Sequence, residues 1–553
     1  MNHELPARRG ARGWPAAAFC LLLCGAYAHW LYLTQNCPLD LAGDEAHYWE
    51  WSRRLDLSYY SKGPLVAYII AASRAALADW SQSQVGSEAL AVRLPAMLLA
   101  ICTGWGIYVL TCNVFRERKT ACAATALTFT MPILVAGSIL MTIDVPLAAA
   151  WTWALICCER GLRTQSIVPW LVAGVLIALG ILAKYTMVLL FPVVGLAILF
   201  EPRYRPYLRR PGPWLAVVVG CLGFAPILIW NARHDWVSFR HVAGQAGLAG
   251  GTKFDPLGPF AYLGGQAAVV NAAWFVGMIW AAVELYRRPR MEDERHDPAA
   301  LRLLLLAMLV PWVAFLAFSF KTKIQPNWPV LALIGGTPIL AAWLDRRLRH
   351  GRREERRPAL ALIAIGVVLG VTGVVLAHRA DWLMPAFQWL TRNAPPWELT
   401  PAAKYDPTAR LRGWAELGAA TVQVLETERA AGREPFILTD DYQVASEIAF
   451  YCPERPPVYC IQAALGSRLS QYDLWTNPIR DAELFVGRPC IYVGGLKPEL
   501  IGEGGAPPVL PDLRLARTVE HQVRGVPIQV WSIHVCPRFA GFPDDVRRIQ
   551  PKY

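Results

Sequence analysis

A succession of long apolar runs constrains the fold of this chain more than any other feature. Hydrophobic residues make up 55% of its 553 residues, and 23 residues are tryptophan, which is too apolar and too aromatic for an ordinary soluble protein. The sequence therefore predicts an α-helical polytopic membrane protein with about 11 transmembrane helices. Runs near the roughly 20 residues that a helix needs to cross a bilayer occur at about 14–33, 89–112, 120–136, 145–158, 168–183, 185–200, 214–230, 260–285, 303–320, 329–344 and 358–377.

The net charge of +12 is explained by topology. Of the 54 Lys and Arg residues, 24 lie in the N-terminal tail and in alternate connections between the runs. By the positive-inside rule these segments are cytoplasmic, which puts the intervening loops and everything after about residue 378 on the outer side. We therefore expect membrane lipids, and no nucleic acid, as a partner. The basic segments are 1–13, 116–119, 159–165, 201–213, 286–302 and 345–357.

Two parts are predicted along the chain. Residues 1–377 form the membrane part, and 378–553 lose the long apolar runs and form a C-terminal periplasmic α/β domain. Within the membrane part, the first outer loop, about 34–88, is unusually long and contains two helical stretches too short or too polar to span. Four cysteines of the outer domain permit disulfides, but their pairing stays open: Cys452, Cys460, Cys490 and Cys536.

In the outer domain, helical patterns cover 410–432 and 442–451. The apolar stretch PFILTD (435–440) lies between these two helices, and strands are expected near PVYCI, CIYVGG and IQVWSIHV.

Two adjacent carboxylates stand in the stretch LAGDEAHYWEW (41–51), just after the first apolar run. Asp44 starts a helical pattern, so an N-cap is the structural alternative to a functional role. On a helix, Asp44 and Tyr48 share one face while Glu45 lies on another. We therefore expect one carboxylate to act and the other to support it, with the surrounding aromatic residues forming a belt at the membrane surface.

A third carboxylate, Asp144 in MTIDVPL (141–147), is expected at the outer mouth of a span. An Asp is costly at this depth and tends to be functional. A helix N-cap ahead of Pro146 is the structural alternative.

Lysine is rare in this chain, since only nine of the 54 basic residues are Lys. A compact ammonium is suited to holding a phosphate, although a snorkelling surface cation is the structural alternative for each. With Asp44 and Asp144, the outer lysines predict one candidate site on the outer face. These lysines are Lys62, Lys184, Lys253, Lys321 and Lys323.

Carboxylates and cations beside a membrane suit the transfer of a group from a lipid phosphate. A carboxylate can take the proton from an acceptor hydroxyl, while lysines stabilise the charge that grows on the departing phosphate. The sequence has no Walker A motif and no Rossmann glycine pattern after a strand. No nucleotide or other cofactor is therefore expected.

Several of these stretches carry a family resemblance. GDEAHYWEWS, SYYSKGPLVAY, TIDVPL, LGILAKYT and KIQPNWP occur in family order and span most of 40–330. With them the chain resembles the polytopic GT-C glycosyltransferases of the protein O-mannosyltransferase superfamily, which include bacterial aminoarabinose transferases that modify lipid A. The resemblance implies a GT-C fold in the bacterial inner membrane and an inverting enzyme that uses a polyprenyl-phosphate sugar on the periplasmic side without a catalytic metal.

The resemblance also implies roles for individual residues. Asp44 is similar to the family's catalytic carboxylate, Asp144 to its second outer-loop aspartate, and Lys62 to the cation on the lipid-linked phosphate. Glu45 joins the catalytic candidates, more as a support than as the base. Further candidates are Lys184, Lys321 and Lys323 for the donor phosphate, and Tyr48, Tyr60, Asn327 and Trp328 for substrate binding.

The substrate stays open at this point. Gly63 in SKGPL departs from the aminoarabinose enzymes, which usually show a second proline neighbour there, so lipid A, another envelope glycan or a secreted protein are all possible acceptors. A lipid-linked glycan flippase or transporter is the alternative function. A flippase or transporter predicts charged residues in both halves of the membrane and broken helices in repeat-related positions. The candidate site residues of this chain instead gather on the outer side of the membrane. A binding scaffold centred on 378–553 is a third interpretation.

Overall fold

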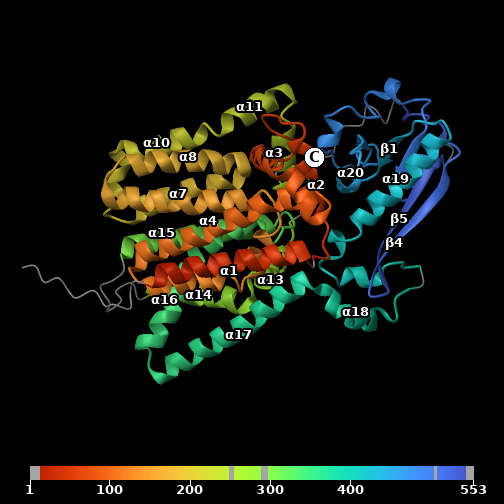
Figure 1. Cartoon of the computed structure of the whole chain (residues 1–553). Coiled ribbons are helices and arrows are strands. Elements are labelled where there is room, and N and C mark those ends of the chain that lie inside the picture. Colours follow the sequence, from red (N-terminus) through yellow and green to blue (C-terminus); the bar gives the residue numbers. More distant parts are fainter. Residues whose placement is uncertain are drawn as a thin grey trace, which may run out of the picture.

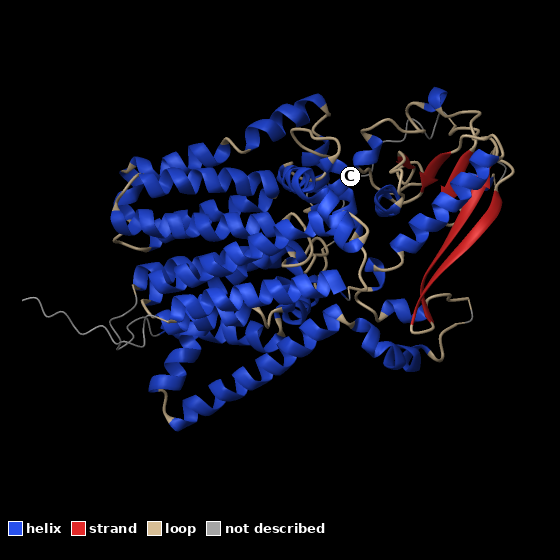
Figure 2. Cartoon of the chain, viewed as in Figure 1, coloured by secondary structure: helices blue, strands red, loops and turns tan. Residues whose placement is uncertain are grey.

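The computed structural model describes residues 13–35, 37–247, 254–287, 297–395, 397–502 and 507–543. The chain forms a bundle of long helices, and beside one end of this bundle lies a smaller part that contains a β-sheet (Figures 1 and 2). We call residues 379–543 the sheet region, and the end of the bundle next to it the sheet-facing end.

The bundle contains helices α1 to α17 (Figure 1). The helices are α1 (Trp14–Gln35), α2 (Gly43–Ser52), α3 (Leu65–Val85), α4 (Ala89–Phe115), α5 (Arg118–Thr128), α6 (Pro132–Gly137), α7 (Asp144–Thr164), α8 (Val168–Ala183), η2 (Tyr185–Leu189), α9 (Leu190–Phe200), η3 (Arg205–Arg209), α10 (Pro211–Cys221), α11 (Phe224–Arg233), α12 (Val237–Gln245), α13 (Gly258–Val270), α14 (Ala272–Arg287), α15 (Pro298–Ser319), η4 (Trp328–Leu331), α16 (Ala332–His350) and α17 (Arg353–His378).

Six helical segments among the described residues are long and apolar enough to cross a membrane, or seven if α13 and α14, which meet at an angle of 108°, make one span. The chain is thus a multi-pass membrane protein. All eleven predicted runs carry helix, but three of them are divided between two α-helices: 120–136 into α5 and α6, where Pro132 begins a new helix, 214–230 into α10 and α11, and 260–285 into α13 and α14. The expected count of about 11 membrane-spanning helices is therefore not confirmed by the described residues. The six segments are Trp14–Gln35, Ala89–Phe115, Pro211–Arg233, Pro298–Ser319, Trp328–His350 and Arg353–His378.

Helices α2 and α3 occupy the long segment between α1 and α4, and neither is among the candidate spans. Every residue of α2 except Asp44 is buried. Trp49 and Trp51 have no exposed surface and fill a core shared with the sheet region. The expected aromatic belt at the membrane surface is therefore wrong for these residues, because helix α20 (Tyr442–Tyr451) of the sheet region covers α2 (Figure 1).

The sheet region holds one five-stranded mixed sheet with strand order β2-β1-β3-β5-β4. Strands β2, β1 and β3 run parallel, and β5 is antiparallel to both β3 and β4. Strands β2, β3 and β5 lie in the three stretches predicted to form strands, and β1 lies in PFILTD, to which no strand was assigned. Strand β4 was not predicted because its sequence, RLARTVEHQV, is largely polar and exposed. The elements are η5 (Ala380–Leu383), α18 (Met384–Thr391), η6 (Pro401–Lys404), η7 (Ala409–Leu411), α19 (Trp414–Ala430), β1 (Phe436–Thr439), α20 (Tyr442–Tyr451), β2 (Val458–Cys460), η8 (Gln471–Asp473), η9 (Ala482–Leu484), β3 (Cys490–Val493), α21 (Pro498–Ile501), β4 (Arg514–Val523) and β5 (Val526–Cys536).

The four cysteines of the sheet region are free thiols. The strand register places Cys490 of β3 directly opposite Cys536 of β5.

Candidate active site

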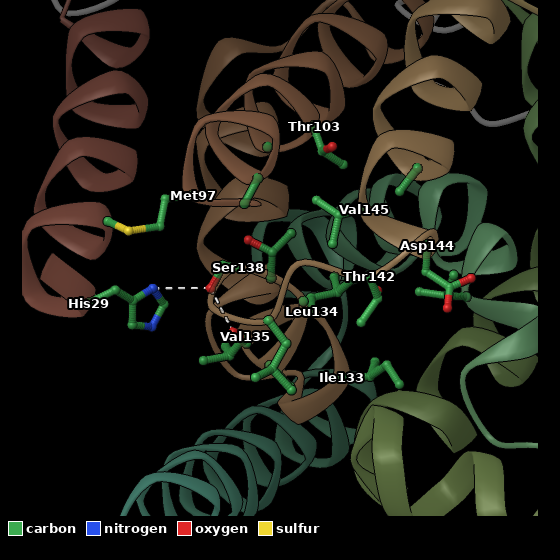
Figure 3. A pocket seen from close by; sticks show the side chains of 18 of the residues that line it. His29, Met97, Thr103, Ile133, Leu134, Val135, Ser138, Thr142, Asp144 and Val145 are labelled. Carbon is green, nitrogen blue, oxygen red and sulfur yellow. Dashed lines mark hydrogen bonds between the residues drawn. The ribbon is translucent and has the colours of Figure 1, made fainter. Parts of the chain in front are cut away.

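One cavity of about 430 Å³ is lined by both Asp44 and Asp144, together with Asn327 and Arg410. Figure 3 shows its wall, with His29 and Ser138 on one side and Asp144 on the other. Most of the wall is apolar and comes from α1, α4, α6 and α7. The cavity thus joins two of the candidate carboxylates to a hydrocarbon-like interior. Representative apolar lining residues are Leu22, Met97, Ile107, Ile133, Leu134 and Val145.

Asp144 begins α7, and neighbouring side chains occupy both of its carboxylate oxygens. Lys184 Nζ lies 2.6 Å from Oδ1, and Asn327 Nδ2 donates a hydrogen bond to Oδ2 at 2.6 Å. Lys184 follows the last turn of α8, where the backbone becomes extended before η2. The side chains of the ion pair are only 9% and 14% exposed. Three predicted site residues from distant parts of the sequence therefore form one well-anchored network.

Lys62 lies in the loop between α2 and α3. Its neighbour Gly63 packs so closely on the end of α8 that a Cβ atom there would overlap the backbone carbonyl oxygen of Leu182. Glycine is therefore required for the loop to approach the end of α8, two residues before Lys184.

The charge of Lys62 is coupled to the rest of the site. The pKa of Lys62 is lowered to about 8, mainly by burial and also by the nearby Lys184 ammonium, while the carboxylates of Asp44 and Asp144 oppose this shift. In the described part of the chain, Lys62 Nζ makes no hydrogen bond or ion pair. This ammonium is thus available to an anionic ligand.

Asp44 is exposed at the start of α2, and the sheet region holds one of its oxygens. Tyr442 Oη donates a hydrogen bond to Oδ1 at 3.1 Å, and Gln443 Nε2 donates to the same atom at 3.2 Å. The two helices approach closely because Gly43 has no side chain: a Cβ atom there would lie 2.6 Å from Gln443 Cβ. Within the described residues, Asp44 Oδ2 accepts no hydrogen bond.

Glu45, the neighbour of Asp44, has no exposed surface. It forms an ion pair with Arg93 at 2.9 Å. Its oxygens also accept hydrogen bonds from the backbone N–H groups of Ala42 at 3.0 Å and Met141 at 2.9 Å. Glu45 thus ties α2 to α4 and to the segment that leads to Asp144, and its surroundings support an anchoring role rather than proton transfer with a substrate.

The two tyrosines predicted to bind substrate are both buried. Burial and the Asp44 carboxylate raise the pKa of Tyr48, so its hydroxyl stays protonated near that acid. The backbone N–H of Tyr60 donates to Gln471 at 2.7 Å, and its ring lies 4.7 Å from that of His241.

The remaining predicted residues are not joined to the carboxylates. Trp328 packs its ring 6.0 Å from Phe315, within a small apolar cluster. Lys321 and Lys323 are exposed, and none of the described hydrogen bonds or ion pairs joins them to Asp44 or Asp144. Lys253 lies outside the described residues. Among the described residues, no three His, Cys, Asp or Glu side chains gather closely enough to hold a metal ion.

Sequence reasoning missed the residues that the sheet region brings to the site. Tyr442 and Gln443 begin α20, directly after Asp441, which caps this helix through the backbone N–H groups of Gln443 and Val444. Arg468 donates to Tyr442 Oη at 3.3 Å, and its guanidinium carbon lies 5.5 Å from the centre of the Tyr442 ring. The N-cap pattern in TDDYQ signals the helix, but nothing in the sequence signals that its first turn meets Asp44.

Comparison with known proteins adds a fold class to this geometry. The sequence profile of the dolichyl-phosphate-mannose-protein mannosyltransferase family matches residues 61–230. Over the whole chain, the structure is similar to that of ArnT from Cupriavidus metallidurans. The TM-score is 0.60 with 15% identity against the form bound to undecaprenyl phosphate, covering 96% of this chain and 100% of that one. Against the apo form the TM-score is 0.57 with 14% identity, covering 95% and 98%. The chain therefore has the fold of this glycosyltransferase structure.

Two curated bacterial proteins are similar in sequence. The lipid A galacturonosyltransferase RgtD of Rhizobium johnstonii is 29% identical over 333 residues, which is 59% of this chain and 65% of that protein. The undecaprenyl phosphate-alpha-4-amino-4-deoxy-L-arabinose arabinosyl transferase of Erwinia tasmaniensis is 28% identical over 376 residues, 62% of this chain and 63% of that protein. The match thus spans less than two thirds of each relative. These likenesses confirm the resemblance to GT-C glycosyltransferases that modify lipid A.

Proposed function

We propose that this chain is an inverting glycosyltransferase that moves a sugar from a polyprenyl-phosphate donor to a cell-envelope acceptor. The observation that carries the proposal is the pairing of Asp44 and Asp144 at one largely apolar cavity, with the Lys62 ammonium close enough to both acids for its charge to be coupled to them. A polyprenyl-phosphate donor needs this combination, because its lipid chain is apolar and the phosphate that departs from the sugar is an anion.

The arrangement suggests how the transfer proceeds. The acceptor oxygen attacks the anomeric carbon on the face opposite the phosphate, the carbon–oxygen bond to the phosphate breaks, and Asp44 takes the acceptor proton. Lys62, which is free of protein partners among the described residues, stabilises the departing phosphate. Lys184 is already paired with Asp144, so we assign this pair to holding the site in shape.

The finer assignments belong to the same proposal. The names of the relatives point to lipid A or another envelope glycan as the acceptor class, with a secreted protein as the further possibility. We place the site and residues 378–553, as an α/β domain, on the periplasmic side of the bacterial inner membrane, and residues 1–377 in the membrane part with about eleven crossings. The support for this placement is the positive-inside rule: alternate connections between the apolar runs are rich in Lys and Arg and are therefore cytoplasmic, which puts the site and the C-terminal part on the opposite side.

The first experiment identifies the substrate. Mass spectrometry of envelope lipids, glycans and proteins from cells with and without the gene should reveal one species that loses the mass of a sugar. The lost mass names the sugar, and the species that carries it names the acceptor. If no envelope species changes in mass, the proposed transfer is wrong.

The second experiment tests the base. With Asp44→Asn in the deletion strain, transfer in isolated membranes should fall by about 10²–10⁴-fold, the usual contribution of a general base. The amount and folding of the protein should stay normal, because Asp44 is exposed. A flippase has no need of a proton acceptor at this position. If membranes with Asp44→Asn transfer the sugar at the wild-type rate, the transporter alternative is therefore the better explanation.

A further inference from the structure

The closest polar contacts of Asp44 come from outside the helix bundle. Its Oδ1 accepts hydrogen bonds from Tyr442 and Gln443, which stand nearly 400 residues away in the sequence. Arg468, also in the sheet region, donates in turn to the Tyr442 hydroxyl. Three side chains of the sheet region therefore form a short chain of contacts that ends on the proposed base.

We propose that the sheet region completes the catalytic centre, with Tyr442 and Gln443 as positioning residues that hold Asp44 by Oδ1 and leave Oδ2 to take the acceptor proton. This inference rests on the proposed function. It differs from it in assigning a catalytic contribution to a part of the chain for which the sequence predicted none, and in naming the reacting atom.

The geometry favours positioning over mere packing. Asp44 is the one residue of α2 that is not buried, so without these two donors its side chain would be free to rotate. Fixing one oxygen of a base orients the other toward the substrate, and small errors in such an orientation are costly to the rate. Tyr442 is a dependable donor, because burial and the Asp44 carboxylate raise the pKa of its hydroxyl.

Other polar and charged side chains near the same carboxylate are not altered by replacing Tyr442 or Gln443. Tyr48 and Lys62 are electrostatically coupled to Asp44 and to Asp144, and Arg410 lines the same cavity. Tyr442→Phe and Gln443→Ala therefore change no charged side chain, although Tyr442→Phe also removes the hydroxyl to which Arg468 donates.

The test is a double-mutant cycle between Asp44 and Tyr442 in the full-length chain. Membranes of the deletion strain carrying wild type, Tyr442→Phe, Asp44→Asn or both are incubated, and the sugar-modified species that the gene deletion identifies is followed by mass spectrometry. We expect Tyr442→Phe to slow transfer about 10-fold, near the value of one hydrogen bond to a charged group, and Gln443→Ala to act in the same direction. In the Asp44→Asn background, Tyr442→Phe should have no further effect, because the amide that replaces the carboxylate cannot take the acceptor proton and its orientation no longer matters to the rate.

The outcomes separate the two proposals. If Asp44→Asn is slow while Tyr442→Phe transfers at the wild-type rate, the positioning role is wrong and the base assignment stands. If Tyr442→Phe costs the same factor in both backgrounds, its role is structural and the inference is again wrong. If Asp44→Asn itself keeps the wild-type rate, the base assignment fails. Tyr459→Phe serves as the matched control, since its ring packs on Phe436 and Phe485 in the sheet region; it should keep the wild-type rate.

Discussion

Asp44 and Asp144 line the same cavity but are held in different ways. Both oxygens of Asp144 are occupied, by the ammonium of Lys184 and the amide of Asn327, at 2.6 Å each. Asp44 is held through Oδ1 alone, at 3.1 and 3.2 Å, by residues of the sheet region. Both oxygens of Asp144 are held by residues of the helix bundle, whereas Asp44 keeps one oxygen for a further partner.

This difference separates support from chemistry within one site. A carboxylate whose two oxygens are both held by protein partners is suited to fixing geometry, whereas a carboxylate with one oxygen unbonded can turn that oxygen toward a substrate. Glu45 extends the series, since it is fully buried and bonded to Arg93 and to two backbone N–H groups. From Glu45 through Asp144 to Asp44, burial falls and free acceptor capacity rises, so stability effects should fall in this order while direct participation in proton transfer rises.

The largest effect on stability is expected at Glu45. Glu45→Ala leaves Arg93 buried, with a side chain only 3% exposed, without its counter-charge. Removing one partner of a buried ion pair typically costs about 3–5 kcal/mol. Equilibrium unfolding in mixed micelles should show a loss of this size in the free energy of unfolding.

The matched control is Asp44→Ala, one residue away on the same helix. Because Asp44 is exposed, its removal should change the free energy of unfolding by at most about 1 kcal/mol. Equal losses in the free energy of unfolding for Glu45→Ala and Asp44→Ala would contradict the distinction between Glu45 as an anchor and Asp44 as the base.

The sequence was informative about the pieces of this site and less so about their assembly. Apolar runs located the helices, and the rarity of lysine drew attention to Lys62 and Lys184, which the structure brings to the two aspartates. The same reasoning included Lys321 and Lys323, which are exposed and unconnected to the carboxylates by the described contacts. Charge alone does not distinguish a lysine at a site from one on a surface.

Tertiary packing explains what sequence reasoning got wrong. The aromatic residues of α2 have the composition of a membrane-surface belt, but Trp49 and Trp51 are buried because α20 lies over them. The contact of Tyr442 with Asp44 depends on that same docking. Local patterns predict a helix and its cap, whereas the meeting of two helices far apart in the chain depends on shape, such as the missing side chain at Gly43.

A smaller loss of stability is expected at Asp144. Asp144→Asn keeps the shape of the side chain but leaves the Lys184 ammonium, which is 9% exposed, without its counter-charge. The loss of a hydrogen bond to a charged group is worth about 1.5–3 kcal/mol, so the free energy of unfolding should fall by that amount, and transfer should fall as the site loosens. Asn327→Ala removes only the amide on Oδ2 and leaves the ion pair with Lys184, so it should cost about 1.5 kcal/mol, the lower end of this range. If Asp144→Asn lowers transfer as strongly as Asp44→Asn without any loss of stability, Asp144 takes part in the chemistry directly.

The smallest effect expected near neutral pH is a dependence of kcat/KM on the protonation of Lys62. Its pKa is about 8, so the ammonium is charged at neutral pH and loses its charge as the pH rises through that value. The kcat/KM for the lipid-phosphate donor reports the free enzyme, and should be flat below about pH 7 and fall about tenfold per unit above pH 8. Lys62→Arg keeps its charge over this range. Its kcat/KM should therefore lose the alkaline fall even if its plateau is lower. A fall that persists unchanged in Lys62→Arg would assign the alkaline limb to another group and remove the evidence that Lys62 holds the donor phosphate.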